Sequence, residues 1–364
     1  MKIGILTFHC AHNYGAVLQC YALQETLKRM GHDVEVIDYR PEYLLDPYKR
    51  FNIHRFISKN LILAAKNIVK EPMMLRARLR RYKAFGKFIN GRLNLSSRVT
   101  ASGISSKYDI YIMGSDQIWN PKITQGFEPV YFGNFNFAKG ERKFIAYAAS
   151  MEAKGLNEEA RDFLKKSLQN FDAVSVRETQ LANMLQPLTG KSIDTVLDPT
   201  LLADSSIWNK IAVRPSIKQK YVLVYQVRMN QRTLEIASDI ARQMNVEVIE
   251  LQAWLSVNLH GDKIQCASPE EFLGWIKYSS CVVTTSFHGT AFSIIFNRPF
   301  YCIKLDDGSD TRSLSLLRNT GLENRLISKD SNPVFSEIDY GKANKNVSDL
   351  RNVSMDFLAK AIEK

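Results

Sequence analysis

Apolar positions along the chain alternate between strand-like runs and helical spacing, and this pattern predicts strands joined by helices. Residues 2–8 form a short apolar run that is typical of a buried strand. Residues 16–30 carry apolar residues three and four positions apart and stop before Gly31, a residue type common just past a helix end. Residues 33–39 alternate as a second strand. Strand, helix and strand in this order predict a right-handed crossover and a parallel sheet.

The alternation of strands and helices continues to about residue 205 and then starts again. Two such stretches indicate an α/β protein of two Rossmann-like domains that face a cleft. In the first stretch, further strands are expected at 108–113, 144–149, 171–176 and 192–197. In the second stretch, strands are expected at 221–227, 246–251, 300–305 and from Cys281 onward.

A chain of 364 residues is too long for one ordinary core, so we expect two domains. The N-terminal domain is assigned to 1–203 and the C-terminal domain to 204–345. Residues 346–364 are expected to form a helix that packs back on the first domain. A basic helical insertion at about 42–95 interrupts the N-terminal domain.

The net charge of +12 is concentrated in the segment 49–92, which carries thirteen Lys or Arg and one acid, Glu71. The rest of the chain holds 36 basic and 36 acidic residues. A basic amphipathic helix is typical of segments that bind an anionic membrane surface or another polyanion. The alternative is a solvated insertion whose apolar stripe packs on its own domain, and no nucleic acid is expected as a partner. The apolar residues of this segment include Phe51, Ile53, Phe56, Ile57, Leu61, Ile62 and Leu63.

Cysteine usage and hydropathy favour a cytoplasmic protein. The five cysteines are scattered and include no CxxC pair, which indicates neither a disulfide framework nor a zinc site. No apolar stretch approaches the roughly 20 residues of a membrane-spanning helix. The first apolar run breaks at His9, so no secretory signal is predicted. If 49–92 binds lipid, the protein would be peripheral at the inner face of the cell membrane.

The segment 281–292 is a candidate for chemistry because it combines a buried strand, a turn and a helix start. Open α/β proteins bind ligands where a strand's carboxyl end leads into a helix, and the helix's free N–H groups favour an anion. His288 lies at the turn, between Ser286 and Gly289, where it can hold an anion or move a proton. The alternative is a core histidine that is hydrogen-bonded to a neighbouring loop.

Polar residues also lie near the ends of other predicted strands. Asp116 offers a carboxylate, and Trp119 offers an aromatic face that suits a sugar. Arg177 follows a strand directly and Arg312 opens a helix near the cleft edge, so each can bind an anion. Asn13 can bind a ligand hydroxyl or cap the helix that follows it. The other structural alternatives are a core tryptophan, ion pairs with nearby carboxylates and a surface charge.

Common cofactor and metal patterns are absent from the sequence. The loop 9–15 is neither a GxGxxG fingerprint nor a Walker loop. The segment 286–289 lacks the serine of a nucleophile elbow at position 288. His9, His12 and Asp116 do not have a recognised metal-ligand spacing. We therefore predict no metal and no redox cofactor.

Taken together and in this order, several segments resemble the polysaccharide pyruvyl transferase family. No single segment is specific, but the ordered set is, and only the insertion 42–95 and the C-terminal tail lie outside it. The segments are GILTF (4–8), NYGAVLQ (13–19), GSDQIWN (114–120), AYAAS (146–150), SVRE (175–178), DPTLL (198–202) and SFHG (286–289).

The resemblance implies a fold similar to that of GT-B glycosyltransferases. It also implies transfer of a pyruvyl group from phosphoenolpyruvate to two hydroxyls of a sugar. The acceptor would be a polysaccharide or lipid-linked glycan precursor, and the products would be a cyclic ketal and phosphate. Phosphoenolpyruvate is the donor substrate, and no cofactor is implied.

In the family, the turn histidine and nearby arginines bind or activate the donor, and by position these are His288 and Arg177. Some relatives carry an arginine where Ser286 stands, so we expect Arg312 or Arg228 to replace it. Ser286 and Gly289 are expected to belong to the same donor site.

For catalysis we expect His288, Arg177 and Asp116, the last as acceptor of a sugar hydroxyl proton. The residues expected to bind the acceptor are Asn13, Tyr14, Trp119 and Asn120.

Two other functions compete with this prediction. A GT-B glycosyltransferase that uses a nucleotide sugar would have the same two-domain cleft. A non-enzymatic polyanion- or membrane-binding protein would act through 49–92, and its binding would be salt-sensitive and independent of His288.

Overall fold

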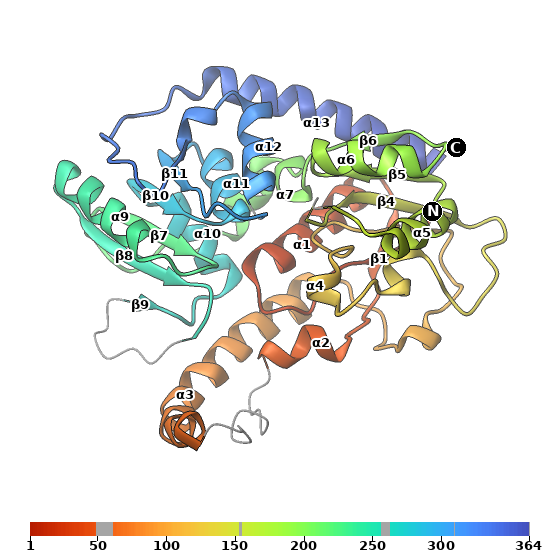
Figure 1. The fold of residues 1–364 in the computed structure, drawn as a ribbon, viewed down its shortest axis with the longest axis horizontal. Coiled ribbons are helices and arrows are strands. Elements are labelled where there is room, and N and C mark those ends of the chain that lie inside the picture. Colours follow the sequence, from red (N-terminus) through yellow and green to blue (C-terminus); the bar gives the residue numbers. More distant parts are fainter. Residues whose placement is uncertain (49–60, 153–154, 256–262, 309, 364) are drawn as a thin grey trace.

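The computed structural model describes residues 1–48, 61–152, 155–255, 263–308 and 310–363, with the backbone alone at 61–73 and 263. Two six-stranded parallel sheets form two domains joined by packed helices (Figure 1). Apolar side chains alternate between the two faces of each sheet; in the first, Ile5 and Leu6 belong to different core clusters. The predicted α/β architecture of two domains is confirmed.

The first sheet has the order β2-β1-β3-β4-β5-β6. Each of its strands matches a predicted one, and the order reverses between β1 and β3, a place where such sheets bind ligands. The strands are β1 (Lys2–Leu6), β2 (Asp33–Val36), β3 (Ile110–Met113), β4 (Lys143–Ala149), β5 (Ala173–Val176) and β6 (Ile193–Thr195).

The second sheet has the order β12-β11-β10-β7-β8-β9, which reverses between β7 and β10. Two of its strands, β9 and β12, were not predicted, because two residues are too few to show a period. The strands are β7 (Tyr221–Gln226), β8 (Glu247–Gln252), β9 (Lys263–Ile264), β10 (Cys281–Thr284), β11 (Phe300–Ile303) and β12 (Leu326–Ile327).

Helices connect the strands, and several of them begin at a polar side-chain cap. The predicted start of α10 is a complete capping box, in which the side chains of Ser268 and Glu271 each bond to the other residue's backbone N–H. The helices are α1 (Tyr14–Arg29), α2 (Glu42–Leu45), α3 (Leu61–Arg92), α4 (Pro121–Thr124), α5 (Glu158–Ser167), α6 (Thr179–Leu185), α7 (Pro199–Leu202), α8 (Ser205–Ile211), α9 (Gln231–Met244), α10 (Pro269–Lys277), α11 (Phe287–Ile295), α12 (Asp310–Thr320) and α13 (Tyr340–Glu363).

The domains are joined by a buried apolar contact between α1 and α10. The ring of Tyr14 stacks on that of Phe272, with centroids 4.5 Å apart and an interplanar angle of 6°. The Tyr14 hydroxyl donates to the Ala267 carbonyl at 3.0 Å. Both rings are fully buried. One apolar core therefore runs from the first domain into the second, with the carboxyl ends of strands from both sheets near the contact.

The last helix, α13, runs back along the first domain at the top of Figure 1. The Leu197 N–H donates to Ser354 Oγ at 2.9 Å, and Lys143 Nζ donates to the Ile362 carbonyl at 2.7 Å. These bonds tie residues of α13 to β4 and to the segment after β6.

The basic insertion contains α2, a turn at Asp46–Tyr48 and the long helix α3, seen at the bottom of Figure 1. Phe85, Phe88 and Ile89 of α3 are buried in the core. The alternative of an apolar stripe packed on its own domain therefore holds for this part of the helix. The side chains of 49–73, including the apolar residues from Phe51 to Leu63, lie outside those described.

Arg81 of α3 is buried and ties the insertion to both domains. Its Nη1 donates to the carbonyls of Gln252 and Gln265 at 3.2 and 2.9 Å. Its Nη2 donates to the carbonyls of His12 and Ala253 at 3.2 and 2.7 Å. None of these four acceptors carries a charge, so the guanidinium keeps its positive field. Within the described ranges, no helix is long and apolar enough to cross a membrane.

Candidate functional site

A buried carboxylate, Asp198, joins the ends of three elements of the first sheet. Arg177, which follows β5, donates from Nη1 to Asp198 Oδ2 at 2.7 Å. Ser115, which follows β3, donates from Oγ to the same oxygen at 3.2 Å. The other oxygen, Oδ1, accepts from the backbone N–H and hydroxyl of Thr200 at 2.9 and 2.7 Å, so Asp198 also caps α7. A carboxylate with this many donors is held in one orientation.

His288 of the second domain faces the same carboxylate. Its Nε2 lies 3.8 Å from Asp198 Oδ2 and is buried without a hydrogen-bond partner. Burial alone would raise the pKa of Asp198, but the His288 ring, the Arg177 guanidinium and the Thr200 hydroxyl hold it well below its usual range. Asp198 therefore stays ionised between a guanidinium of one domain and an imidazole of the other.

Two glycines permit this position of His288. A Cβ at Gly15, in the first turn of α1, would overlap the His288 ring. A Cβ at Gly289 would overlap the side chain of Thr284, so the glycine lets α11 start close to β10. The Ser286 hydroxyl caps α11 by accepting from the Gly289 N–H at 3.4 Å. The imidazole thus lies between the N-terminal ends of α1 and α11, a favourable place for an anion.

Two arginines bring positive charge to the site. Arg177 is buried, and its Nε and Nη2 have no hydrogen-bond partner. Its guanidinium lies 5.1 Å from the centroid of the Phe287 ring. Arg312 of α12 is half-buried and forms no hydrogen bond or ion pair with any described residue. Burial and the neighbouring Arg177 charge lower the pKa of Arg312. Both arginines line the same cavity.

Arg177, Asp198, Phe287 and Arg312 line a cavity of about 340 Å³ between the domains. Small-ligand sites usually start near this size. The cavity combines N–H donors that lack acceptors with residues from both sheets, so it suits a small anion with more than one charged group.

The family model for polysaccharide pyruvyl transferases matches residues 13–307. The chain belongs to this family. The matched range contains Arg177, Asp198 and His288 and ends just before Arg312. No curated protein sequence matches the chain.

Solved structures with a similar fold have low sequence identity to this family member. A putative UDP-N-acetylglucosamine 2-epimerase from Listeria monocytogenes is 11% identical, with 99% of this chain and 90% of that chain covered and a TM-score of 0.47. UGT89C1 from Arabidopsis thaliana is 12% identical, with 100% and 94% covered and a TM-score of 0.40. The glycosyltransferase SnogD from Streptomyces nogalater is 10% identical, with 98% and 96% covered and a TM-score of 0.42.

Glu178 is a second buried carboxyl in the cavity of this pyruvyl transferase family member. Its Oε1 accepts from the Ser150 hydroxyl at 2.6 Å, while its Oε2 is buried without a partner. Arg177 Nε is 3.9 Å away. Burial raises the pKa of Glu178, although Arg177 and Ser150 act in the opposite direction. The pKa values of two carboxyls in one site, Asp198 and Glu178, are thus shifted in opposite directions, an arrangement that suits acid–base chemistry.

Most residues predicted for the donor site lie together. Arg177 and His288 both face Asp198, with Ser286 and Gly289 at the same helix start. Asp116 Oδ1 lies 3.6 Å from Arg177 Nη2. Arg228, the alternative to Arg312, is instead a half-exposed side chain that pairs with Asp307 and lies 3.8 Å from Glu152.

The structure corrects the expected acceptor residues. Trp119 is fully buried, stacks on Phe132 and donates to the Tyr131 carbonyl, so it forms no wall for a sugar. Tyr14 is equally inaccessible in the contact between the domains.

The two predicted acceptor asparagines are helix caps. Asn13 Oδ1 accepts from Ala16 N, and Asn120 Oδ1 accepts from Lys122 N. These bonds agree with the alternative of a cap for Asn13.

Sequence reasoning missed Asp198 and Glu178 as site residues. Asp198 directly follows the predicted strand 192–197, and Glu178 directly follows Arg177. Their positions at the ends of strands were the signal that could have identified them. No set of three or more His, Cys, Asp and Glu side chains in the described residues is placed to hold a metal ion.

Asp198→Asn is expected to destabilise the folded protein. We expect the free energy of unfolding to fall by about 3–5 kcal/mol at neutral pH, because the buried Arg177 would lose its charged partner. The depressed pKa of Asp198 stabilises the fold above the unfolded value of about 3.9, and this contribution is lost as the pH falls. The difference between the two proteins should therefore shrink in acid, as measured by urea denaturation.

Asp194→Asn is the matched control, since Asp194 is exposed on β6. Its stability should stay within about 0.5 kcal/mol of the wild type. Equal stability of Asp198→Asn and the wild-type protein would contradict the assigned role of this carboxylate.

Proposed function

We propose that this protein transfers the pyruvyl group of phosphoenolpyruvate to two hydroxyls of a sugar and releases phosphate. The observation that carries the proposal is a pair of arginines in one cavity beside His288: Arg177, whose Nε and Nη2 lack acceptors, and Arg312. Phosphoenolpyruvate bears a phosphate and a carboxylate on the same carbon, C2, and arginines and helix N-termini are the groups that bind such anions. Membership of the family supports the same reaction.

The reaction starts with protonation of the donor's methylene carbon, which turns C2 into an oxocarbenium ion. A first sugar hydroxyl adds to C2 and loses its proton. The C2–O bond to phosphate then breaks, and phosphate leaves with the electron pair. A second hydroxyl adds to C2 and completes the ketal. Over the cycle one hydroxyl proton replaces the proton placed on carbon, and the other leaves with phosphate.

The residues divide these tasks according to their surroundings. Glu178 supplies the proton to carbon, because its carboxyl is buried beside the donor cavity and its pKa is raised. Arg177 and Arg312 hold the two anionic groups, and His288 contacts the phosphate as it leaves. Asp116, on the side of the first domain, takes up the proton of a sugar hydroxyl. Asp198 holds Arg177 in place and is a positioning residue.

The donor site is tested with phosphoenolpyruvate, UDP and GDP in thermal-shift and phosphate-release assays with glycosides and lipid-linked glycans. We expect stabilisation by phosphoenolpyruvate, about 2.7 kcal/mol at 100 times its Kd, and glycan-dependent phosphate release. Arg312→Gln should raise KM for phosphoenolpyruvate by about 10–100-fold, since a charged hydrogen bond is worth about 1.5–3 kcal/mol.

Arg228→Gln is the control and should change KM by less than about threefold, because exposed ion pairs contribute little. His288→Ala should lower phosphate release by about 10²–10⁴-fold while the fold persists. Stabilisation by UDP or GDP without any response to phosphoenolpyruvate would favour a nucleotide-sugar glycosyltransferase and contradict the proposal.

The role of Glu178 is tested with Glu178→Gln across a pH series. In the wild-type protein, phosphate release should fall as the pH rises through the raised pKa of Glu178, because the acid loses its proton. The variant should be slower by about 10²–10⁴-fold and lack this alkaline limb. Because the pKa of Glu178 is raised in the folded state, its protonated carboxyl stabilises the fold below the unfolded pKa of about 4.3. This stabilisation is lost as the pH rises through the folded pKa, so the stability of the variant relative to the wild-type protein should increase towards pH 8.

Glu159→Gln, at an exposed position of α5, controls for the loss of one negative charge. An unchanged rate and pH profile in Glu178→Gln would remove Glu178 from the mechanism.

We also propose that the segment 49–92 holds the protein near an anionic membrane face. Among its described side chains, Leu75 and Leu79 are exposed one helical turn apart, with Arg76 and Arg80 exposed beside them. Deletion of the segment would also remove Arg81, so substitution is the cleaner test.

We expect the wild-type protein to float with vesicles of phosphatidylcholine and phosphatidylserine and less so with added salt. The double variant Leu75→Glu/Leu79→Glu should float several-fold less. Val353→Glu on α13 is the control, since Val353 is 57% exposed. Absence of flotation by the wild-type protein, or equal flotation of the double variant, would rule out this surface.

A further inference from the structure

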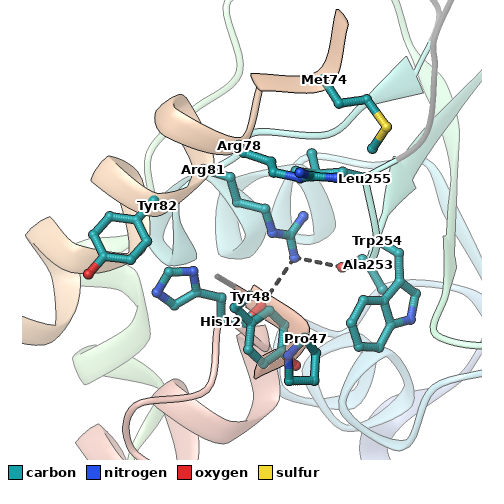
Figure 2. A pocket seen from close by; sticks show the side chains of 10 residues that line it. All are labelled: His12, Pro47, Tyr48, Met74, Arg78, Arg81, Tyr82, Ala253, Trp254 and Leu255. Carbon is teal, nitrogen blue, oxygen red and sulfur yellow. Dashed lines mark hydrogen bonds between the residues drawn. The ribbon is translucent and has the colours of Figure 1, made fainter. Parts of the chain in front are cut away.

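A second cavity lies between the insertion and the second domain, outside the donor site. Its walls come from the turn before α3, from α3 itself and from the segment that follows β8 (Figure 2). The end of β8 is at the same edge of its sheet as the end of β10, the edge at which such sheets bind ligands. The cavity is lined by His12, Pro47, Tyr48, Met74, Arg78, Arg81, Tyr82, Ala253, Trp254 and Leu255.

An aromatic pair forms one side of this cavity. The rings of Tyr48 and Trp254 are stacked with centroids 5.7 Å apart and an interplanar angle of 3°. The Trp254 side chain is held by a bond from Nε1 to the Val227 carbonyl at 3.0 Å, yet the residue is 44% exposed. Trp119 and Trp208 are fully buried, and Trp275 is partly buried. A fixed and exposed indole is a surface on which the apolar face of a sugar ring can lie.

Positive charge forms the opposite side. Figure 2 shows Arg78 and Arg81 above the aromatic pair. Arg81 donates hydrogen bonds to four backbone carbonyls, none of which carries a charge. These four partners therefore do not neutralise its positive charge. The described residues that line the cavity include no Asp or Glu. The open volume of about 80 Å³ admits a small anionic group but not a whole sugar ring.

The cavity is close to the reaction site. Burial raises the pKa of Tyr48, the Arg81 charge lowers it and the Asp116 charge raises it. His12 lines the cavity, and three residues further along the chain the backbone of Gly15 lies against the His288 ring of the reaction site. A sugar that reaches from this cavity to the reaction site would bring its hydroxyls towards the donor.

We propose that Tyr48, Arg78, Arg81 and Trp254 form a binding site for the glycan acceptor, with a sugar ring on the exposed face of Trp254 and its attached phosphate or carboxylate under the arginines. This inference rests on the proposed function and moves the acceptor from Trp119 and Asn120 to the contact between the insertion and the second domain. The insertion and the segment after β8 thus supply acceptor specificity, while the two sheets supply the donor site.

Isothermal titration calorimetry on the full chain tests the site with four probes: galactose 1-phosphate, galacturonate, methyl galactoside and inorganic phosphate. The three sugar probes are also tested as their mannose counterparts. We expect one or both anionic sugars to bind about tenfold or more tightly than the neutral glycoside and phosphate. Preference for the 1-phosphate indicates a phosphate-linked sugar, and preference for the uronate indicates an acidic one. Trp254→Ala should weaken this binding by about tenfold, and Trp254→Phe by less than about threefold.

Tyr278→Ala is the matched control, because Tyr278 is also an exposed aromatic residue of the second domain, at the end of α10. Its affinity should equal that of the wild-type protein. Equal affinity of Trp254→Ala, equal binding of inorganic phosphate alone, or no binding of any probe would overturn the proposed site.

Phosphoenolpyruvate separates this proposal from the proposed function. Trp254→Ala should keep the full thermal stabilisation by phosphoenolpyruvate, since the donor cavity is unchanged. If the wild-type protein binds anionic sugars through Trp254 but does not respond to phosphoenolpyruvate, the reaction is wrong and the sugar site remains. If it responds to phosphoenolpyruvate while Trp254→Ala binds sugars normally, the sugar site is wrong and the reaction remains.

Discussion

The arrangement of the site depends on one buried carboxylate, Asp198. It accepts from Arg177, Ser115 and Thr200 and faces His288, so it joins three elements of the first domain to the second. A buried guanidinium without such a partner would be strongly unfavourable. Asp198 uses only one of the hydrogen-bonding edges of Arg177 and leaves Nε and Nη2 for an external anion. The same contact therefore stabilises the cation and keeps it available.

The position of His288 is determined by both domains together. The stack of Tyr14 on Phe272 holds α1 against α10, and Gly15 then leaves just enough space for the imidazole. The N-terminal ends of two helices consequently meet at one ring, which neither domain would provide alone. Any motion that separates the domains would break up the proposed donor site, so binding of a small anion and closure of the domains should be coupled.

Burial has opposite consequences for charged groups with different neighbours. Asp198 and Glu178 are both buried, but Asp198 has enough donors to remain ionised, whereas Glu178 has one donor and retains its proton more readily. The basic insertion shows the same contrast. Arg76 and Arg80 are exposed on α3, whereas Arg81 is buried and bonded to backbone carbonyls of both domains. A count of charges along the segment thus overstates the charge that faces solvent and misses its part in joining the domains.

The sequence by itself determined ten of the twelve described strands, the long helices, the loops that carry the proposed donor residues and the family, because apolar periodicity and ordered motifs are local properties of the chain. The tertiary structure decided which polar residues meet. Trp119 has the aromatic side chain expected of a sugar-binding surface but packs in the core, while Trp254 is exposed. Asp198 gains its role from Arg177 and from His288, ninety residues further along the chain. Such contacts depend on strand order and domain packing, which spacing along a sequence does not encode.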